Sequence, residues 1–284
     1  MYIVLLLFMF STPLRFFTRT STKIYMQTHP TSTIITKHNN ASYSPENITQ
    51  FLLHNPGNQG KKLISISPGG YKGFYMMGAA AYIKKHYDLS NYIYSGASAG
   101  AWNSLLMTYT GDISIFRQHI IDPTIRGAKS ISEMEQVLKR RLLESYSTKD
   151  FDLDKLFIGV TTVERGRKPS TIIYTRFEDL DDAIDCCIAS SHIPFITGNM
   201  TYTYHNLLSF DGGFSKYPYL GFIKPVLHIT PGMWKSSDIP AKIWKDIHEY
   251  TTLFSKDRYE FDALYDQGYR DAIYRKDILD KLLL

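Results

Sequence analysis

The sequence predicts an α/β fold, because strand-like and helix-like runs alternate along its central part. The run 63–67 alternates apolar residues with serine, as a strand does, and the run 74–86 has apolar residues at near-helical spacing. A second pair follows, with a strand-like run at 91–95 and an apolar helix-like run at 101–107. Glycine-rich turns separate strand from helix in both pairs. Two consecutive βα units favour a mostly parallel central sheet covered by helices.

Four parts are expected along the 284 residues, a length that is long for one domain but not clearly two. Residues 1–45 read as a leader and 46–61 as a linker or peripheral turn. The α/β domain spans 62–226, and 227–284 adds a C-terminal strand and helices that pack on it.

The leader begins with a nearly continuous apolar run, 1–10, which is too short to span a bilayer. The residues from 11 to 44 are rich in Ser and Thr and carry basic but no acidic side chains. This composition suits a signal or targeting segment, a membrane-associating arm, or the ordinary start of a folded domain. Localisation therefore stays open, with membrane association as the expectation.

The later elements follow from local patterns. Ser130 and Glu133 form a capping-box pattern that opens a helix running toward 144. The remaining expected elements, in chain order, are strands 156–162 and 170–175, paired as a hairpin across the basic turn 165–169, a helix at 179–190, strands 207–210 and 225–230, and an amphipathic tail from 241.

Charge and cysteine content narrow the function classes. Lys and Arg number 32 against 27 Asp and Glu, a surplus that slightly favours anionic membrane surfaces. It is too small to argue for nucleic acid, and no nucleic-acid-binding motif is present. The two cysteines, Cys186 and Cys187, are neighbours in a helix-like stretch, so no disulfide framework is expected. Oligomeric state is not readable from the sequence.

The most informative motif is Gly-Ala-Ser-Ala-Gly at 96–100. It joins a strand-like run to a helix-like run, which is the context of a nucleophile elbow. In such a turn, Gly96 and Gly100 leave room for a tight backbone, and the hydroxyl of Ser98 projects toward substrate. Short Gly/Ser strings also mark ordinary turns, so the flanking elements are what favour a nucleophile here.

A second glycine-rich turn lies upstream, between the expected strand 63–67 and helix 74–86. Paired glycines at a helix N-terminus expose backbone N–H groups, which can stabilise the oxyanion formed at an ester carbonyl. The candidate donors are Gly69, Gly70 and Tyr71, followed by Lys72 and Gly73. Taken alone, the segment also reads as a plain strand-to-helix turn.

A third motif, Asp211-Gly212-Gly213, follows the expected strand 207–210. A carboxylate on a glycine turn at a strand end can reach a neighbouring serine. The commoner role of Asp-Gly is an aspartate that stabilises its own turn.

In this order and spacing, the three motifs resemble those of the patatin-like phospholipase family over about residues 62–226. The small-residue stretch 185–195, with its proline, is similar to the family's as well. The resemblance implies a three-layer α/β/α sandwich and a lipid acyl hydrolase acting on phospholipids or acylglycerols at a membrane surface. It implies Ser98 as nucleophile, Asp211 as base, an acyl-enzyme, and neither a metal nor a cofactor.

Two positions bear on this resemblance. Pro68 stands where the family often has the first glycine of its loop, and proline has no N–H to donate. Lys72 stands where the family has Arg or Lys. A cation there can hold the loop or contact a phosphate group, or it can be an ordinary solvated lysine.

Two alternative functions remain. An α/β-hydrolase triad of Ser98, Asp211 and either His228 or His248 has the right chain order. The short separation between the glycine loop and the elbow argues against it, because it puts the two in consecutive βα units. The other alternative is a lipid-binding protein that has lost catalysis, which Pro68 suggests.

Overall fold

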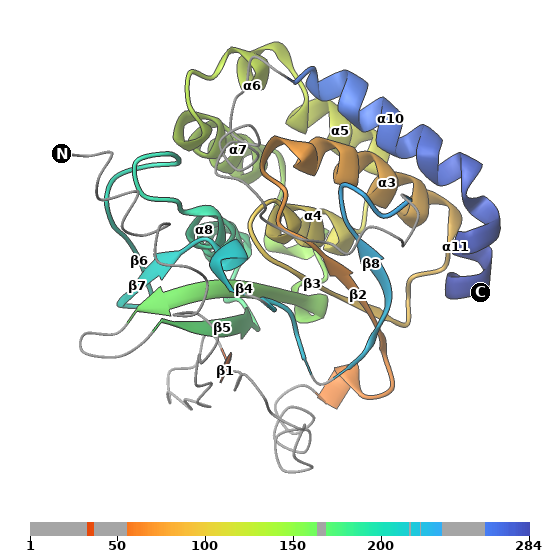
Figure 1. Ribbon diagram of the computed structural model, residues 1–284, viewed down its shortest axis with the longest axis horizontal. Coiled ribbons are helices and arrows are strands. Elements are labelled where there is room, and N and C mark those ends of the chain that lie inside the picture. Colours follow the sequence, from red (N-terminus) through yellow and green to blue (C-terminus); the bar gives the residue numbers. More distant parts are fainter. Residues whose placement is uncertain (1–32, 37–55, 164–168, 216, 222, 235–258) are drawn as a thin grey trace.

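The computed structural model describes residues 33–36, 56–163, 169–215, 217–221, 223–234 and 259–284 (Figure 1). Within these residues, eight strands form one sheet in the order β1-β5-β4-β3-β2-β8, with β6 and β7 attached beside β4. The strands are β1 (Thr33–Thr36), β2 (Lys62–Ile66), β3 (Tyr92–Gly96), β4 (Leu156–Val163), β5 (Ser170–Thr175), β6 (Tyr202–Tyr204), β7 (Leu207–Phe210) and β8 (Pro225–Ile229).

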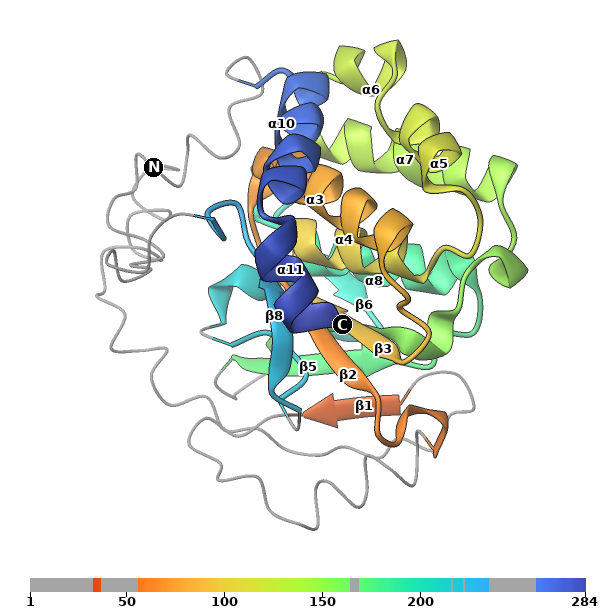
Figure 2. The ribbon, with the colours of Figure 1, turned by 90° about the vertical axis from the view of Figure 1, so that its right-hand side faces the viewer.

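Helices cover one face of this sheet, which Figure 2 shows edge-on. They are α3 (Gly73–His86), α4 (Ala99–Thr108), α5 (Ile113–Ile120), α6 (Pro123–Gly127), α7 (Ile131–Ser145), α8 (Leu180–Ser191), α10 (Phe261–Tyr274) and α11 (Lys276–Leu283). On the other face, Leu220 packs in a smaller apolar cluster with side chains of β2 to β5. The α/β class is confirmed, and the arrangement is compatible with three layers.

The sheet is mixed, so the expectation of a mostly parallel sheet is wrong. Parallel pairs join β2 to β3, β2 to β8 and β3 to β4. The pairs β1–β5, β4–β5, β4–β7 and β6–β7 are antiparallel. The reason is chain length between strands: β4 and β5 follow each other too closely for a crossover helix, and such neighbours pair antiparallel.

Strands β3 and β7 run toward each other along one edge of β4. The strand β5 pairs with β4 from Ile158 to Thr162 and so occupies the opposite edge. On the shared edge, β3 ends with Gly96 opposite Ile158, and β7 ends with Phe210 opposite Thr161. Because the two strands point at each other, the residues that follow each of them meet in the short space between their ends.

Most local predictions within the described residues are confirmed. The expected βα units appear as β2–α3 and β3–α4, the hairpin as β4–β5, the helix 179–190 as α8 and the strand 225–230 as β8. The capping pattern opens α7, where Ser130 Oγ accepts the Glu133 N–H at 3.1 Å. The Glu133 carboxylate accepts the Lys129 N–H at 2.6 Å, one residue before the position that a capping box predicts.

Several expectations fall outside the described residues. These are the basic turn up to residue 168, the amphipathic tail between 241 and 254, and the leader 1–45 apart from 33–36. That short stretch pairs with β5 as β1. The end of the expected linker forms a 3-10 turn, Pro56–Asn58, whose Asn58 Nδ2 donates to the Asp154 carbonyl at 2.9 Å.

Helix α10 packs on α3 through two glycines that let the backbones touch. A Cβ placed on Gly78 would lie 2.0 Å from the Tyr265 carbonyl oxygen, and one on Gly268 would lie 1.9 Å from that of Tyr75. Tyr75 also donates its hydroxyl to Asp271 of α10 at 2.7 Å. The C-terminal helix therefore belongs to the domain and supports the helix next to the glycine loop.

We predict that Gly268→Ala destabilises the protein by about 1–3 kcal/mol, because the added methyl group must push two packed helices apart. Urea unfolding followed by circular dichroism measures the change. Gly127→Ala is the matched control, since an added Cβ there has nothing within 4 Å. Equal unfolding midpoints for the two variants would contradict the close packing of α3 and α10.

Candidate active site

Ser98 has a strained backbone, with φ 55° and ψ −129°, directly between β3 and α4. Residues other than glycine rarely adopt this conformation, which costs about 1–3 kcal/mol. The flanking glycines hold it. A Cβ on Gly96 would lie 2.1 Å from the Gly100 carbonyl oxygen, and one on Gly100 would lie 2.1 Å from that of Ile66. The predicted elbow is therefore present, and β2 is in contact with it.

Asp211 follows β7 and begins a 3-10 turn, Gly212–Phe214. Its N–H donates to the His192 carbonyl at 2.7 Å, and its Oδ1 accepts the Gly213 N–H at 2.6 Å. Gly212 is needed for space, because a Cβ there would lie 2.4 Å from the Gly159 carbonyl oxygen. Asp211 thus plays the turn role expected of Asp-Gly and still has its second carboxylate oxygen available.

That second oxygen meets the serine. Ser98 Oγ donates to Asp211 Oδ2 at 2.6 Å, although the two residues are 113 positions apart in the chain. Both are buried, each 4% exposed. Burial raises the pKa of Asp211 to about 7, although the hydrogen bonds from Ser98 and from the Gly213 N–H both lower it. The pair is a serine hydroxyl hydrogen-bonded to a carboxylate that titrates near neutrality.

The glycine-rich turn lies beside this pair. Gly70 and Tyr71 line the same pocket as Ser98, whereas Gly69 is buried behind them, where a Cβ would lie 2.9 Å from Met76 Cε. Gly70 has a positive φ of 52°. Within the described part of the chain, the Gly70 N–H has no backbone acceptor, while the Lys72 N–H donates to the Gly69 carbonyl at 3.1 Å. The sequence named three candidate donors, and the pocket brings Gly70 and Tyr71 to Ser98.

Pro68 and Gly73 each connect this turn to another part of the site. The position of a Cβ on Gly213 lies 3.2 Å from Pro68 Cβ, so the proline packs against the turn that carries Asp211. Gly73 begins α3 where a Cβ would lie 2.9 Å from that of Ala99, and its carbonyl accepts from Asn103 Nδ2 at 3.1 Å. Lys72 is half-buried and lies outside the pocket lining.

A pocket opens from Ser98 into the helical layer, with about 820 Å³ of empty space that includes its open mouth. Its walls are mostly apolar and include Phe74 and Met77 of α3, Leu105 and Leu106 of α4, Phe116 of α5 and Leu138 of α7. Its apolar lining suits a hydrocarbon chain.

Helix α8 connects the two halves of the site. Ser190 at its end accepts the Ser98 N–H at 2.8 Å and donates to the Gly159 carbonyl at 2.7 Å. Because the Ser98 N–H is used in this way, it is not a free oxyanion donor. The sequence marked this stretch only as small residues before a proline, and it gave no signal that Ser190 braces the elbow.

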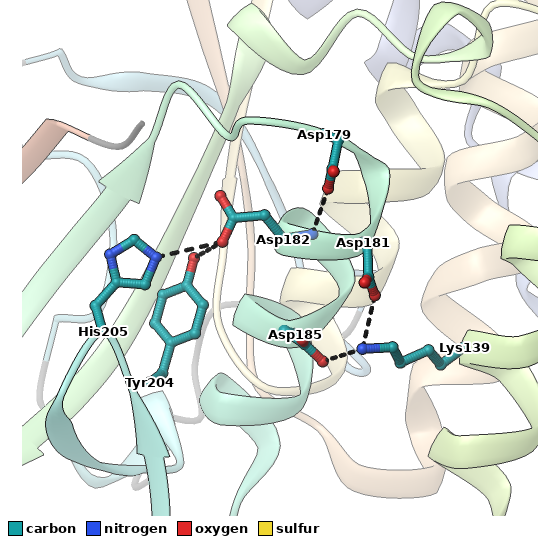
Figure 3. Close-up of polar contacts among 7 residues, drawn as sticks. All are labelled: Lys139, Asp179, Asp181, Asp182, Asp185, Tyr204 and His205. Atoms are coloured by element: carbon teal, nitrogen blue, oxygen red, sulfur yellow. Dashed lines mark hydrogen bonds and ion pairs between the residues drawn. The ribbon is translucent and has the colours of Figure 1, made fainter. Parts of the chain in front are cut away.

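Polar contacts of other α8 residues attach this helix to its neighbours α7 and β6 (Figure 3). Lys139 of α7 bridges Asp181 and Asp185 of α8, each at 2.6 Å. Asp182 accepts the Tyr204 hydroxyl at 2.7 Å, which joins α8 to β6. These contacts align α7, α8 and the β6–β7 hairpin, and therefore the parts that carry the pocket wall, Ser190 and Asp211.

His228, one of the two histidines considered for a catalytic triad, contacts a residue other than Ser98 or Asp211. His228 Nδ1 is 2.6 Å from the Ser65 hydroxyl, and burial lowers its pKa. The second candidate, His248, lies outside the described residues. Among the described residues, no histidine hydrogen-bonds the side chain of Ser98 or Asp211.

The described residues contain neither a candidate metal site nor a candidate membrane-spanning helix. No three His, Cys, Asp or Glu side chains there are grouped so that they would hold a metal ion. No helix within those residues has both the length and the apolarity needed to cross a bilayer.

Comparison with known proteins adds no family assignment. The sequence matches no family model, and a search of curated proteins gives no match.

The pKa of Asp211 predicts a pH-dependent stability difference for Asp211→Asn. Below pH 3.8 the carboxyl is protonated in the folded and unfolded states alike. As pH rises from there to about 7, the unfolded chain releases the proton and the folded chain keeps it, so the cost to the folded state grows and then stays constant. The uncharged Asn variant should therefore be more stable than wild type at pH 8, by up to about 4 kcal/mol.

Urea unfolding between pH 4 and pH 8 measures this, and the gap should shrink toward pH 4. Ser98→Ala is the control, because it keeps the carboxyl and should lose stability with rising pH at least as strongly as wild type, since it removes a hydrogen bond that lowers the pKa of Asp211. Parallel curves for wild type and Asp211→Asn would contradict the raised pKa.

Proposed function

We propose that this protein is a lipid acyl hydrolase of the patatin-like type, which cleaves carboxylic ester bonds with Ser98 as nucleophile and Asp211 as general base. The observation that carries the proposal is the 2.6 Å hydrogen bond from Ser98 Oγ to Asp211 Oδ2. A serine hydroxyl is a poor nucleophile without an adjacent base, and the most effective base has a pKa near the working pH. A carboxylate with a pKa of about 7 meets that requirement.

In the first step, ionised Asp211 takes the proton from Ser98 Oγ as that oxygen attacks the ester carbonyl carbon. The carbonyl oxygen becomes an oxyanion, which the backbone N–H of Gly70 stabilises together with the N-terminus of α4. The tetrahedral intermediate then collapses. The bond to the alcohol breaks, the alcohol takes the proton from Asp211, and the acyl group stays on Ser98.

In the second step, water attacks the acyl-enzyme carbonyl and passes a proton to Asp211. Collapse of this second intermediate breaks the bond to Ser98 Oγ, which recovers the proton from Asp211. The products are a free fatty acid and the starting enzyme. Strain at Ser98 keeps the hydroxyl presented to both steps without a conformational change.

The substrate class follows from the pocket. An apolar cavity of this kind stabilises an acyl chain by about 0.8 kcal/mol for each buried methylene group. Phospholipids and acylglycerols supply such chains, and a membrane surface is the partner that presents them. The net charge of +5 favours anionic surfaces modestly.

Two rival functions are less well supported. A Ser-Asp-His triad needs a histidine next to Asp211, whereas His228 is bonded to Ser65. Loss of catalysis through Pro68 is disfavoured because the proline packs against Gly213 and leaves the Gly70 N–H at the pocket.

We predict that Ser98→Ala and Asp211→Asn each lower ester hydrolysis by at least about 10³-fold, as removal of a nucleophile or its base does. Release of fatty acid from phospholipid and triacylglycerol vesicles measures the loss, and Ser98→Ala should also lose labelling by a fluorophosphonate. His228→Ala is the control and should keep most of the wild-type rate. Hydrolysis that survives in Ser98→Ala would contradict the proposal, and loss in His228→Ala would revive the triad.

The pH dependence gives an independent prediction. Because Asp211 must be ionised to act as a base, kcat/KM should rise with pH through an apparent pKa near 7 and level off above it. Below that midpoint the rate should fall about tenfold per pH unit. Initial rates on a soluble short-chain ester between pH 5 and pH 9 give the profile. A flat profile over this range would show that Asp211 is not the base.

A further inference from the structure

The pocket contains one acidic side chain that the proposed mechanism does not use. Glu135 lies on α7 and lines the same cavity as Ser98, yet only 3% of its surface is exposed. Its neighbours on the helix face toward the cavity are the apolar residues Ile131, Met134 and Leu138. A buried carboxyl group in apolar surroundings is rare unless it has a partner or a function.

The charge state of Glu135 follows from its surroundings. Burial raises its pKa well above the usual range, and the charge of Asp211 adds to this, while the Ser191 hydroxyl and the Trp102 indole oppose it. Burial therefore favours the neutral form of the Glu135 carboxyl group. A neutral carboxylic acid donates one hydrogen bond and accepts others.

The polar groups beside Glu135 are already engaged with one another. Trp102 Nε1 donates to Ser191 Oγ at 3.1 Å, and Ser191 Oγ donates to the Cys187 carbonyl at 2.9 Å. An indole and a hydroxyl each have a single hydrogen to donate. Both hydrogens therefore have acceptors other than Glu135, whose side chain lines the cavity.

Glu135 also lines the cavity that opens from Ser98. It lies beside Trp102, which follows Ser98 by four residues, about 6 Å along α4. The two carboxylate oxygens of Asp211 already have Ser98 and Gly213 as partners.

We propose that Glu135 determines substrate specificity by hydrogen-bonding an oxygen substituent on the acyl chain, so that the pocket favours oxygenated acyl groups, such as hydroxylated ones, over unsubstituted chains. The expected preference in reaction rate rests on the proposed hydrolase function. The expected preference in binding does not depend on catalysis. An unsubstituted chain buries the carboxyl group without a partner. A chain with a hydroxyl group at the matching carbon supplies that partner.

Site-directed variants test this. Glu135→Met replaces the carboxyl group with an apolar chain of similar length, and Glu135→Gln keeps a group that donates and accepts hydrogen bonds. The substrates are nitrophenyl esters of straight-chain acids, unsubstituted or hydroxylated at successive carbons. Wild type should prefer one hydroxyl position by about 10–100-fold in kcat/KM, since a pocket built to hydrogen-bond a substrate rejects an analogue without that group. Glu135→Met should lose this preference, and Glu135→Gln should keep most of it.

Two controls separate the explanations. The acetyl ester has no chain to carry a distal hydroxyl group, so its kcat/KM in each variant measures any effect of the substitution on the chemical step, and the long-chain ratios are compared after division by it. The midpoint of the pH profile is measured for the same variants, because the charge of Asp211 acts on Glu135. A shifted midpoint with an unchanged substrate ratio would overturn the proposal and make Glu135 a residue that tunes the base.

Binding by calorimetry completes the design, with free hydroxylated and unsubstituted fatty acids as the probes. If no ester is hydrolysed, the proposed function fails. The specificity proposal is then decided by binding alone: wild type should bind the hydroxylated acid more tightly than the unsubstituted one, and Glu135→Met should not. Wild type that hydrolyses the acetyl ester yet discriminates among none of the longer chains, in rate or in binding, would overturn the proposal. Thermal unfolding of both variants checks that each is folded.

Discussion

The site depends on one backbone conformation, the positive φ of Ser98. A conformation that costs about 1–3 kcal/mol persists only where the surrounding structure leaves no alternative. Here the constraint comes from direct backbone contacts, because Gly96 touches the Gly100 carbonyl and Gly100 touches that of Ile66. Ser190 adds a hydrogen bond to the Ser98 N–H. The end of β2, the end of β3, the start of α4 and the end of α8 all have to be in place before the hydroxyl can point at Asp211.

The meeting of two residues 113 positions apart is a consequence of strand register. Strand β3 is parallel to β4 and β7 is antiparallel to it, and both use the same edge of β4. Their ends therefore face each other, at Ile158 and Thr161 of β4. If β7 had paired parallel to β4, it would run in the same direction as β3, and Asp211 would follow the end of β7 that lies away from the end of β3. The mixed sheet is thus the feature that closes the dyad, although the sequence favoured a mostly parallel one.

The local parts of this site are predictable from the sequence because each requires particular residues at fixed spacing. The elbow needs small residues on both sides of Ser98, and the Asp211 turn needs Gly212, so both leave a local signature. The register of β7 leaves none, since it is set by contacts with β4 that are distant in the chain. Glu135 was missed for a related reason: its helix carries many charged residues, and nothing in the local pattern distinguishes the acid that faces the pocket from those that face solvent. Helices were expected within 227–284, and α10 is one of them, but its close contact with α3 depends on Gly78 and Gly268, which are far apart in the chain.

The apolar pocket and the base are coupled by the same physical cause. A free aspartate is too weak a base to activate serine efficiently, and Asp211 reaches a pKa of about 7 because burial disfavours its charge. In the proposed mechanism, the low-polarity walls that would accommodate an acyl chain therefore also set the strength of the base. The same burial raises the pKa of Glu135, which favours the form that adds no second charge near Asp211. An acyl chain that enters the pocket would displace water and lower the local polarity further, so in the proposed mechanism substrate binding should raise the pKa of Asp211, and with it the pH at which kcat reaches its plateau.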